Sequence, residues 1–249
     1  MVTDPLEYLK QAVPLRARIY IRERQREWHR ARVWRRSARR LKRDPRGSDR
    51  LWSDLVYGWG RGWSAEPAYL EATAAAALAE TGPILECGSG LTTIVLAAVA
   101  RQTGSTVWTL EHDSYWLKVV ESELGRLRLD VNMRLAPLRD YGGFDWYDVD
   151  SSALPTFSLV ICDGPPGWTR GGRYGLLPVL GDRLAPGCAI LLDDAARPGE
   201  QEVLRQWTSR VPLRYDIRGD EKPFATVKLN PGEVTSAAHD DERPTQRSF

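Results

Sequence analysis

Several residue types that mark common classes of protein are scarce in this 249-residue chain. Its three cysteines, Cys87, Cys162 and Cys188, have no C-x-x-C spacing and lie in or beside apolar segments, so we expect buried thiols rather than disulfides or a cysteine zinc site. The three histidines lie far apart in the sequence and therefore indicate no zinc cluster. No apolar run approaches the roughly 18 residues of a membrane span, and none follows the paired arginines as a signal peptide would require. The sequence therefore predicts a cytoplasmic protein without a membrane span.

Charge is unevenly distributed along the chain. Residues 15–50 hold fourteen arginines and one lysine against four acidic residues, a net charge of +11, although the whole chain carries only +2. The remainder therefore carries −9. This asymmetry in charge predicts a basic appendage on an acidic body, able to meet an anionic partner. The length of the chain and its hydrophobic content of 42% suit one large α/β domain with additions.

The basic segment has the periodicity of an amphipathic helix. Between residues 15 and 41 the apolar side chains recur at helical spacing, at Trp28, Ala31, Trp34, Ala38 and Leu41. We expect this stripe to pack and the arginines to cover the other faces. Three roles stay open for those arginines: a solvated face, a grip on nucleic acid or an acidic peptide through residues 16–43, or contact with a membrane surface or a second copy in a homodimer.

Composition changes divide the chain into four predicted parts. We expect a basic helical extension at 1–50, a connection and helix at 51–80, a Rossmann-like domain at 81–230 and a disordered tail at 231–249. The connection, residues 51–63, is rich in tryptophan and glycine and should interrupt helical structure. Its aromatic residues either pack the N-terminal helices onto the sheet or form a lid over a ligand: Tyr57, Trp59 and Trp63. Ser64 can cap the following helix, with Pro67 in its first turn.

The second half of the chain alternates between strand and helix patterns. Strands are expected near 83–87, 106–111, 131–135, 157–162 and 188–192. Residues 213–217 and 224–229 flank a Gly-Asp-Glu-Lys-Pro turn and should form an antiparallel hairpin. The predicted fold class is therefore α/β, with a doubly wound, mostly parallel seven-stranded sheet and a C-terminal antiparallel hairpin.

A glycine turn after the first expected strand predicts a nucleotide-cofactor pocket. The apolar run Ile84-Leu85 ends in Glu86 and leads into Gly88-Ser89-Gly90, and the next expected strand ends in Glu111. Such a turn brings backbone N–H groups close to a ligand, and the second acid can accept hydrogen bonds from both hydroxyls of a ribose. A dinucleotide fingerprint would need a third glycine where this chain has Thr93, which argues against a nicotinamide cofactor.

Over roughly residues 65–230 the chain resembles the class I S-adenosylmethionine-dependent methyltransferases. The matching segments are Glu86-Cys87-Gly88-Ser89-Gly90, Glu111-His112-Asp113, Asp163-Gly164-Pro165-Pro166-Gly167 and Asp193-Asp194, in this order. The resemblance implies S-adenosylmethionine as cofactor. It implies contacts to the methionine part from Gly88, Ser89, Gly90 and Thr92, to the ribose from Glu111, and to adenine from His112, Pro137 and Leu138. It also implies a contact between Glu86 and the ammonium through water or backbone. Asp163 ends the expected strand at 157–162, which places its carboxylate at the mouth of the same crevice.

Three aspartates at strand ends resemble a metal site. In catechol and metal-dependent sugar O-methyltransferases, an acid after the fourth strand and an acidic pair after the fifth hold magnesium, which implies Asp163, Asp193 and Asp194 as ligands here. Oxygen ligands from adjacent strand ends suit such a hard cation. In the alternative interpretation one aspartate caps the next helix and the other pairs with Arg197. Pro166 stands where the catechol enzymes supply a basic lysine.

Two loops carry the remaining candidates. Asp163-Gly164-Pro165-Pro166 resembles the Asp/Asn-Pro-Pro-aromatic loop of amino-group methyltransferases, but the aromatic residue, Trp168, comes later. Asp163 is the first candidate for the catalytic base. The glycines around Arg173 and Tyr174 would let a second loop close over a ligand, where these side chains could bind an acidic group and the acceptor hydroxyl; a plain surface loop is the alternative.

The favoured function is S-adenosylmethionine-dependent O-methylation of a small molecule or natural product, with or without a metal. A metal-independent N-methyltransferase acting on an amine, a peptide or nucleic acid is the first alternative. A non-catalytic nucleic-acid-binding protein with this fold is the second, and a nicotinamide dehydrogenase is a distant one.

Overall fold

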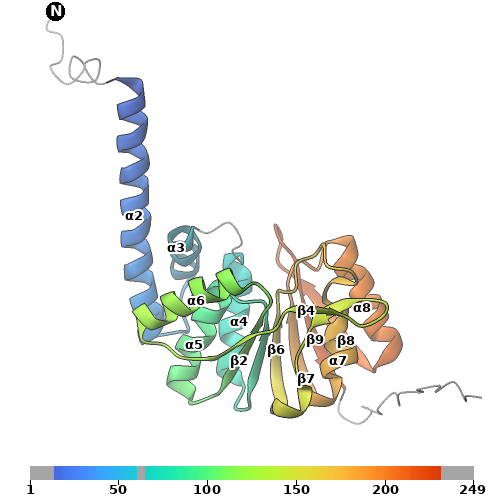
Figure 1. The fold of residues 1–249 in the computed structure, drawn as a ribbon. Helices are drawn as coiled ribbons and strands as arrows, with labels where there is room; N and C mark the ends of the chain where they lie inside the picture. The colour runs from blue at the N-terminus through green and yellow to red at the C-terminus, as the bar shows by residue number, and fades with distance from the viewer. Residues whose placement is uncertain (1–13, 61–64, 231–249) are drawn as a thin grey trace, which may run out of the picture.

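A computed structural model describes residues 14–60 and 65–230 of the chain. Its centre is a seven-stranded sheet with helices on both faces (Figure 1). The helices are α2 (Leu15–Arg43), α3 (Asp49–Trp59), α4 (Pro67–Ala79), α5 (Leu91–Thr103), α6 (Ser114–Leu127), α7 (Leu176–Leu180) and α8 (Pro198–Arg210). The strands are β1 (Ile84–Cys87), β2 (Val107–Glu111), β3 (Asn132–Leu135), β4 (Leu138–Asp140), β5 (Asp145–Tyr147), β6 (Phe157–Cys162), β7 (Leu184–Leu192), β8 (Leu213–Arg218) and β9 (Phe224–Leu229).

The strand order is β3-β2-β1-β6-β7-β9-β8. The first five of these strands pair in parallel, whereas β9 runs antiparallel to both β7 and β8. The predicted fold class and the C-terminal hairpin are confirmed. The chain changes direction across the sheet between β1 and β6, and ligands of such sheets bind outside the carboxyl ends of the strands at this switch point.

Both faces of the sheet are buried. Neighbouring residues of each central strand point to opposite faces, and each face packs in its own hydrophobic core. Ile84 and Leu159 pack under α4, α5 and α6, while Leu85 and Val160 face α7 and α8. This explains why the central strands are continuous apolar runs. All three cysteines are buried and free, as expected.

Helix α2 is docked on the body only through its C-terminal half. Trp34, Ala38 and Leu41 are buried there, and the Trp34 indole donates to Glu123 Oε1 of α6 at 2.6 Å. The expectation that Trp28 packs with Trp34 is wrong: the Trp28 side chain is 60% exposed. Trp34 follows Trp28 by six residues, so the two side chains point about 120° apart around the helix. Figure 1 shows the other half of α2 standing clear of the body.

Residues 49–59 form helix α3, which corrects the expectation of a connection through 51–63. Gly58 and Gly60 were expected to interrupt helical structure, but Gly58 lies within α3 and Gly60 caps its C-terminus. A Cβ on Gly58 would lie 2.7 Å from the Trp34 backbone, so this glycine allows α2 and α3 to cross closely. Gly60 ends α3 in the left-handed conformation, at φ 57°. Trp59 is buried against Trp34 and Trp116 and packs rather than forming a lid.

Two further features complete the comparison with the sequence. The short antiparallel pair β4 and β5 was not expected. The predictions for Trp63, for Ser64 as a cap and for a disordered tail at 231–249 lie outside the described residues; Pro67 does begin α4. Within 14–60 and 65–230, every helix is too short or too polar to cross a lipid bilayer.

Candidate functional site

A cavity of about 510 Å³ opens at the carboxyl ends of β1, β2, β6 and β7. Such a volume lies in the range of small-molecule and cofactor sites. The turn after β1 contributes Gly88, Ser89 and Gly90, and the end of β2 contributes Glu111 and His112. The ends of β6 and β7 contribute the acidic side, which is described below.

The glycine turn leaves room for a ligand. Gly88 has a φ of 85°, and a Cβ there would lie 2.9 Å from the Gly164 backbone, so this residue joins the turns after β1 and β6 closely. Gly90 differs, because a Cβ there would meet no atom within 4 Å. Since Gly90 lines the cavity and caps α5, a side chain at this position would enter the open space over the N-terminus of a helix.

Glu86 stabilises the glycine turn through hydrogen bonds in the protein interior. Its Oε2 accepts the hydroxyls of Thr93 and Thr109, each at 2.8 Å, and Thr93 Oγ1 in turn accepts the Gly90 N–H at 2.8 Å. Burial raises the pKa of Glu86 to about 7, although the threonine hydroxyls that donate to it oppose the shift. Glu86 is fully buried and does not line the cavity, so its position favours an indirect role.

Glu111 carries the negative charge at the β2 end of the cavity. Its Oε2 accepts the N–H and the hydroxyl of Ser89, at 2.9 and 2.7 Å. Its Oε1 accepts the Asp113 N–H at 2.9 Å and lies 3.0 Å from His112 Nδ1. Burial alone would raise the pKa of Glu111, but these hydrogen bonds lower it below its usual value. The same contact with Glu111 raises the pKa of His112, against the effect of burial.

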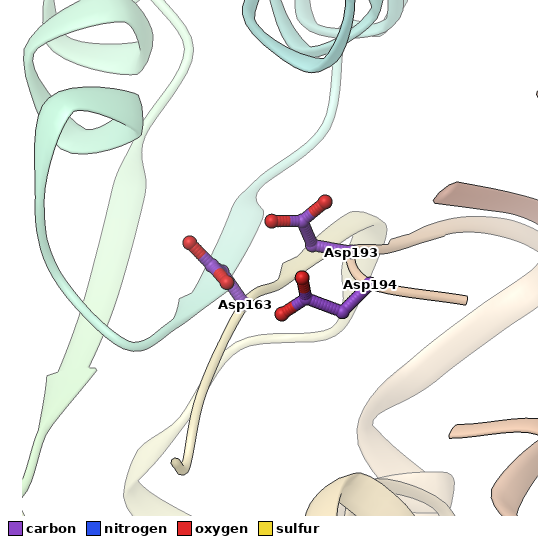
Figure 2. A group of neighbouring side chains, drawn as sticks. All are labelled: Asp163, Asp193 and Asp194. Atoms are coloured by element: carbon purple, nitrogen blue, oxygen red, sulfur yellow. The ribbon is translucent and has the colours of Figure 1, made fainter. Parts of the chain in front are cut away.

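The three predicted metal ligands lie together at the other end of the cavity. Figure 2 shows Asp163 at the end of β6 facing Asp193 and Asp194 at the end of β7. One oxygen from each of the three lies within 4.8 Å of the others. Asp193 lines the cavity and is 5% exposed, and burial raises its pKa to about 8, with further contributions from Asp163 and Asp194.

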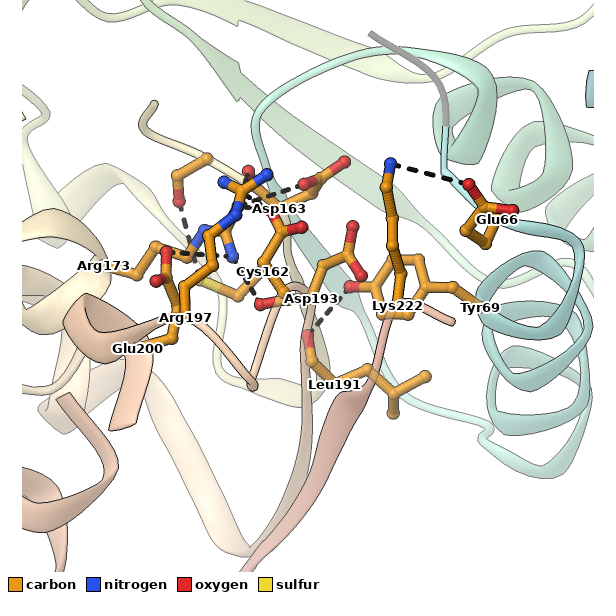
Figure 3. Close-up of polar contacts among 12 residues, drawn as sticks. Glu66, Tyr69, Cys162, Asp163, Arg173, Leu191, Asp193, Arg197, Glu200 and Lys222 are labelled. Carbon is orange, nitrogen blue, oxygen red and sulfur yellow. Dashed lines mark hydrogen bonds and ion pairs between the residues drawn. The ribbon is translucent and has the colours of Figure 1, made fainter. Parts of the chain in front are cut away.

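The buried guanidinium of Arg173 reaches the same cluster (Figure 3). Its Nη2 lies 3.1 Å from both Asp163 Oδ1 and Asp194 Oδ2, and its Nη1 lies 3.4 Å from Glu200 Oε1. It also donates to the main-chain oxygens of Asp163 and Asp193. Burial would lower the pKa of Arg173, but the surrounding carboxylates, Asp163 foremost, raise it above its usual value. A permanent cation therefore sits among the acids.

Comparisons with known proteins identify this architecture. No family model matches the chain, and neither does any curated protein. Among solved structures, the cofactor-bound protein Rv0187 from MTB aligns with a TM-score of 0.54 and 18% identity, over 74% of this chain and 88% of that one. The O-methyltransferase TomG from Streptomyces achromogenes, in complex with S-adenosylmethionine, aligns with a TM-score of 0.51 and 14% identity, over 68% and 82%.

A third similar structure is an S-adenosylmethionine-dependent O-methyltransferase from Thermotoga maritima, with a TM-score of 0.51 and 14% identity over 74% of this chain and 73% of that one. The chain has the fold of the class I S-adenosylmethionine-dependent methyltransferases. At identities of 14 to 18% the likeness establishes only the fold of the chain, so the function of the site depends on its own residues.

The cofactor side of this methyltransferase fold fits S-adenosylmethionine. Gly90 leaves a space that a Cβ would fill, and an ionised Glu111 lies beside it. Tyr147 also lines the cavity, and its buried hydroxyl has no hydrogen-bond partner among the described residues. These groups suit a ligand with a ribose and polar substituents, since buried polar atoms tend to be paired when a site is filled.

The acidic side does not fit a magnesium ion while Arg173 is in place. A divalent cation bound by Asp163 and Asp194 would have to displace the guanidinium that already contacts both, or lie against it in a buried site. Arg197 also contacts Asp194, at 2.9 Å, as the alternative interpretation expected. Two arginines therefore already contact the cluster.

Several predicted site residues lie away from the cavity. Tyr174 packs in the core, with its ring 5.0 Å from that of Phe144 and the Arg210 guanidinium 5.2 Å away on the ring face. Arg173 and Tyr174 belong to a short 3-10 helix, in which neighbouring side chains point about 120° apart, so only one of them faces the acids. Pro137 and Leu138 do not line the cavity either. Residues 136 and 137 connect β3 to β4, which begins at Leu138.

The cavity also includes residues that sequence reasoning missed. Trp116 donates its indole N–H to the Ser89 carbonyl at 2.7 Å and so fixes the glycine turn from α6. Its place shortly after Glu111-His112-Asp113 was the available signal. Tyr147 lies on the unexpected strand β5, and Lys222 lies in the hairpin turn, 3.6 Å from Glu66. No local pattern links either residue to the glycine turn.

Proposed function

We propose that the chain transfers a methyl group from S-adenosylmethionine to a hydroxyl oxygen of a small molecule, without a divalent cation. One observation carries this proposal. A single cavity joins an open glycine turn and an ionised Glu111 at one end to the Asp193 carboxylate at the other. A cofactor and an acceptor can therefore occupy the same cavity.

The donor end would be formed by the turn after β1 and by the end of β2. Gly88, Ser89, Gly90 and Thr92 would hold the methionine part, and Glu111 would accept hydrogen bonds from the ribose hydroxyls. His112 would lie beside adenine. S-adenosylmethionine supplies an activated methyl group on a sulfonium, so the protein has mainly to align the acceptor with it and to remove a proton.

The acceptor end would be formed by the carboxylates. Asp193 is supported as the proton acceptor because it lines the cavity, and because burial raises its pKa to about 8, which makes its ionised form a stronger base than an ordinary aspartate. Arg173 would be a positioning residue that keeps Asp163 and Asp194 in place. Arg197, Lys222 and the 72% exposed Trp168 also line the cavity and leave room for an aromatic or anionic substituent.

An amine acceptor is the second candidate. In its ionised form, the Asp193 carboxylate that would take a proton from a hydroxyl could instead bind a substrate ammonium, and the Pro165-Pro166 loop with Trp168 resembles the amino-group enzymes in part. NMR of a product made with 13C-labelled cofactor separates the two, because a methyl carbon bound to oxygen resonates downfield of a methyl carbon bound to nitrogen.

Labelled methyl transfer from S-adenosylmethionine to panels of phenols, hydroxy acids and amines tests the proposal. We expect transfer to a hydroxyl in the presence of EDTA, with loss of at least about a hundredfold in Asp193→Asn, the range for removal of a general base. Transfer that stops on addition of EDTA and returns with Mg²⁺ would refute the metal-free mechanism. Unchanged transfer by Asp193→Asn would refute the role of Asp193.

A further inference from the structure

Helix α2 carries a surface that the methyl-transfer cavity does not use. The helix contains twelve arginines and Lys42 against only Glu23 and Glu27. Six of the arginines line a shared groove on its outer side: Arg32, Arg35, Arg36, Arg39, Arg40 and Arg43. We call these six residues the arginine ridge.

Most of the arginine ridge faces away from the body, and Arg35 and Arg39 lie at its edge beside α3 and α6. The buried residues of the same helical segment, Trp34, Ser37, Ala38 and Leu41, follow one another at helical spacing and face α3, α5 and α6. The Lys42 ammonium donates to the Leu127 carbonyl at 2.6 Å, which fixes the end of α2 to α6. The ridge is therefore held rigidly while its guanidinium groups point to solvent.

The charge of the ridge is not balanced by the protein. Within the described part of the chain, none of its six arginines forms an ion pair with a carboxylate. Arginines four residues apart, such as Arg32, Arg36 and Arg40, repel one another and weaken an isolated helix. Anions laid along the ridge would relieve this repulsion, and guanidinium groups bind phosphate oxygens in a paired geometry.

The length and direction of α2 suit a linear polyanion. Its 29 residues extend about 40 Å at 1.5 Å per residue. The part of α2 before the ridge adds the 60% exposed Trp28, whose ring lies 5.5 Å from the Arg32 guanidinium. An exposed tryptophan beside arginines is a surface on which bases stack.

The arrangement of apolar residues argues against a membrane surface. A helix that lies in a lipid interface gathers its apolar side chains on one face. The exposed apolar residues of α2 include Ile19, Tyr20 and Ile21, which are consecutive and therefore point in three directions. The outward face at residues 32–43 is arginine, so nothing there would enter the lipid.

A protein partner fits less well than nucleic acid. Stable protein interfaces centre on buried apolar and aromatic anchors, whereas nucleic-acid interfaces are polar and strongly positive. The groove that all six arginines line contains no apolar side chain, and only Arg35 and Arg39 of the six also border a neighbouring hollow with Trp34 and Trp59. We propose that the outer face of α2, centred on the arginine ridge, binds the phosphodiester backbone of nucleic acid without sequence preference.

Fluorescence anisotropy with the full chain tests this proposal. The labelled probes are a mixed-sequence single-stranded RNA, an RNA duplex and a DNA duplex of about 20 nucleotides, each titrated between about 50 and 200 mM salt. Because each neutralised phosphate adds slightly less than one unit to the salt slope, we expect log K against log salt to fall with a slope of about −3 or steeper. The three probes distinguish RNA from DNA and single strands from duplexes.

A matched pair of variants localises the binding. Arg32→Gln with Arg36→Gln and Arg40→Gln should weaken binding at least tenfold and make the slope shallower by about two to three units. The control replaces exposed Arg101, Arg214 and Arg218 by glutamine, with the same loss of charge, and should keep the affinity within about twofold. Circular dichroism and S-adenosylhomocysteine binding check that both variants are folded.

Three results would overturn the proposal. The first is a folded wild-type chain that binds none of the probes at about 50 mM salt. The second is an equal loss of affinity in the two triple variants, which would make the attraction a property of net charge alone. The third is binding to vesicles of anionic phospholipid that is lost in the ridge variant while nucleic acid does not bind. None of these results bears on methyl transfer, which has its own test.

Discussion

Arg173 and Glu86 are both buried, and each controls its neighbours through charge and hydrogen bonds. Arg173 sits among Asp163, Asp194 and Glu200 in the place that a cation would take. Glu86 fixes the glycine turn through Thr93. Substituting either residue should therefore change the stability of the protein, which can be measured independently of the rate of methyl transfer.

Arg173→Met should leave three carboxylates without their buried cation. Breaking such a pairing costs about 3 to 5 kcal/mol, so we expect a large loss in the free energy of unfolding by urea. The half-exposed Arg197 contacts the same Asp194, and Arg197→Met should cost less than about 1 kcal/mol. If Arg173→Met does not fold, Arg173→Lys retains one charge with fewer hydrogen bonds and should lie between the two.

The same variant tests whether arginine replaces a metal. Millimolar Mg²⁺ or Mn²⁺ should raise the melting temperature of Arg173→Met, because the emptied acidic cluster can then bind the ion, and should leave the wild type unchanged. A wild-type melting temperature that rises with Mg²⁺ and falls with EDTA would contradict our account of this cluster.

Glu86→Gln should remove a pH dependence of stability. Burial raises the pKa of Glu86 from 4.5 to about 7, and nearby Asp163 adds to the shift. The folded state thus favours the protonated form, whose stabilising contribution is complete below about pH 4.5 and is lost as the pH rises through about 7. Glutamine resembles protonated Glu86, so the variant should be more stable than wild type at about pH 8, by up to about 3 kcal/mol, and similar at about pH 5.

Urea denaturation at the two pH values measures this difference. The exposed Glu121→Gln serves as the control and should follow the wild type at both. A Glu86→Gln variant that is destabilised equally at both pH values would mean that Glu86 is ionised throughout and holds the threonines by charge.

At the scale of elements, the docking of α2 depends on its close crossing with α3 at Gly58. A Cβ at Gly58 would lie 2.7 Å from the Trp34 backbone, so Gly58→Ala should force the two helices apart. We expect a loss of about 1 to 3 kcal/mol and a change in tryptophan fluorescence, because the Trp34 and Trp59 rings lie 5.2 Å apart.

Gly125→Ala is the matched control for this change. Gly125 also lies within a helix, α6, but a Cβ there meets nothing within 4 Å. Alanine at that position should therefore raise stability by about 0.5 to 1 kcal/mol. Equal effects of the two substitutions would show that helix propensity, not the crossing, governs Gly58.

The helices and strands were predictable where the signal is local. The alternation of β1, α5 and β2 could be read from apolar runs and one glycine turn. Helix α3 could not, because Gly58 and Gly60 look like breakers until the crossing with Trp34 and the left-handed helix end are known. The exposure of Trp28 follows from its angle to Trp34 around the helix and from where the body ends beneath α2, and only the first of these can be read from the sequence.

At the scale of the whole molecule, the site was only partly predictable. The order of acids along parallel strands placed Glu111, Asp163 and Asp193 at one edge of the sheet, because parallel strands end together. The sequence did not predict that Arg173 pairs with the aspartates. Arg173 reaches them only because the loop after β6 folds back across the strand ends, and the same path turns Tyr174 into the core.

The central claim concerns the methyl-donor cavity, and calorimetric titration with S-adenosylhomocysteine tests it most directly. The wild type should bind with one site per chain, and Glu111→Ala should weaken binding at least tenfold through loss of a charged hydrogen-bonding group. Gly90→Val should stay folded, because its side chain meets no protein atom within 4 Å at Cβ, yet lose binding, because it fills the cavity. A folded wild type that binds no S-adenosylhomocysteine, or a Gly90→Val variant that binds as tightly as wild type, would contradict the account.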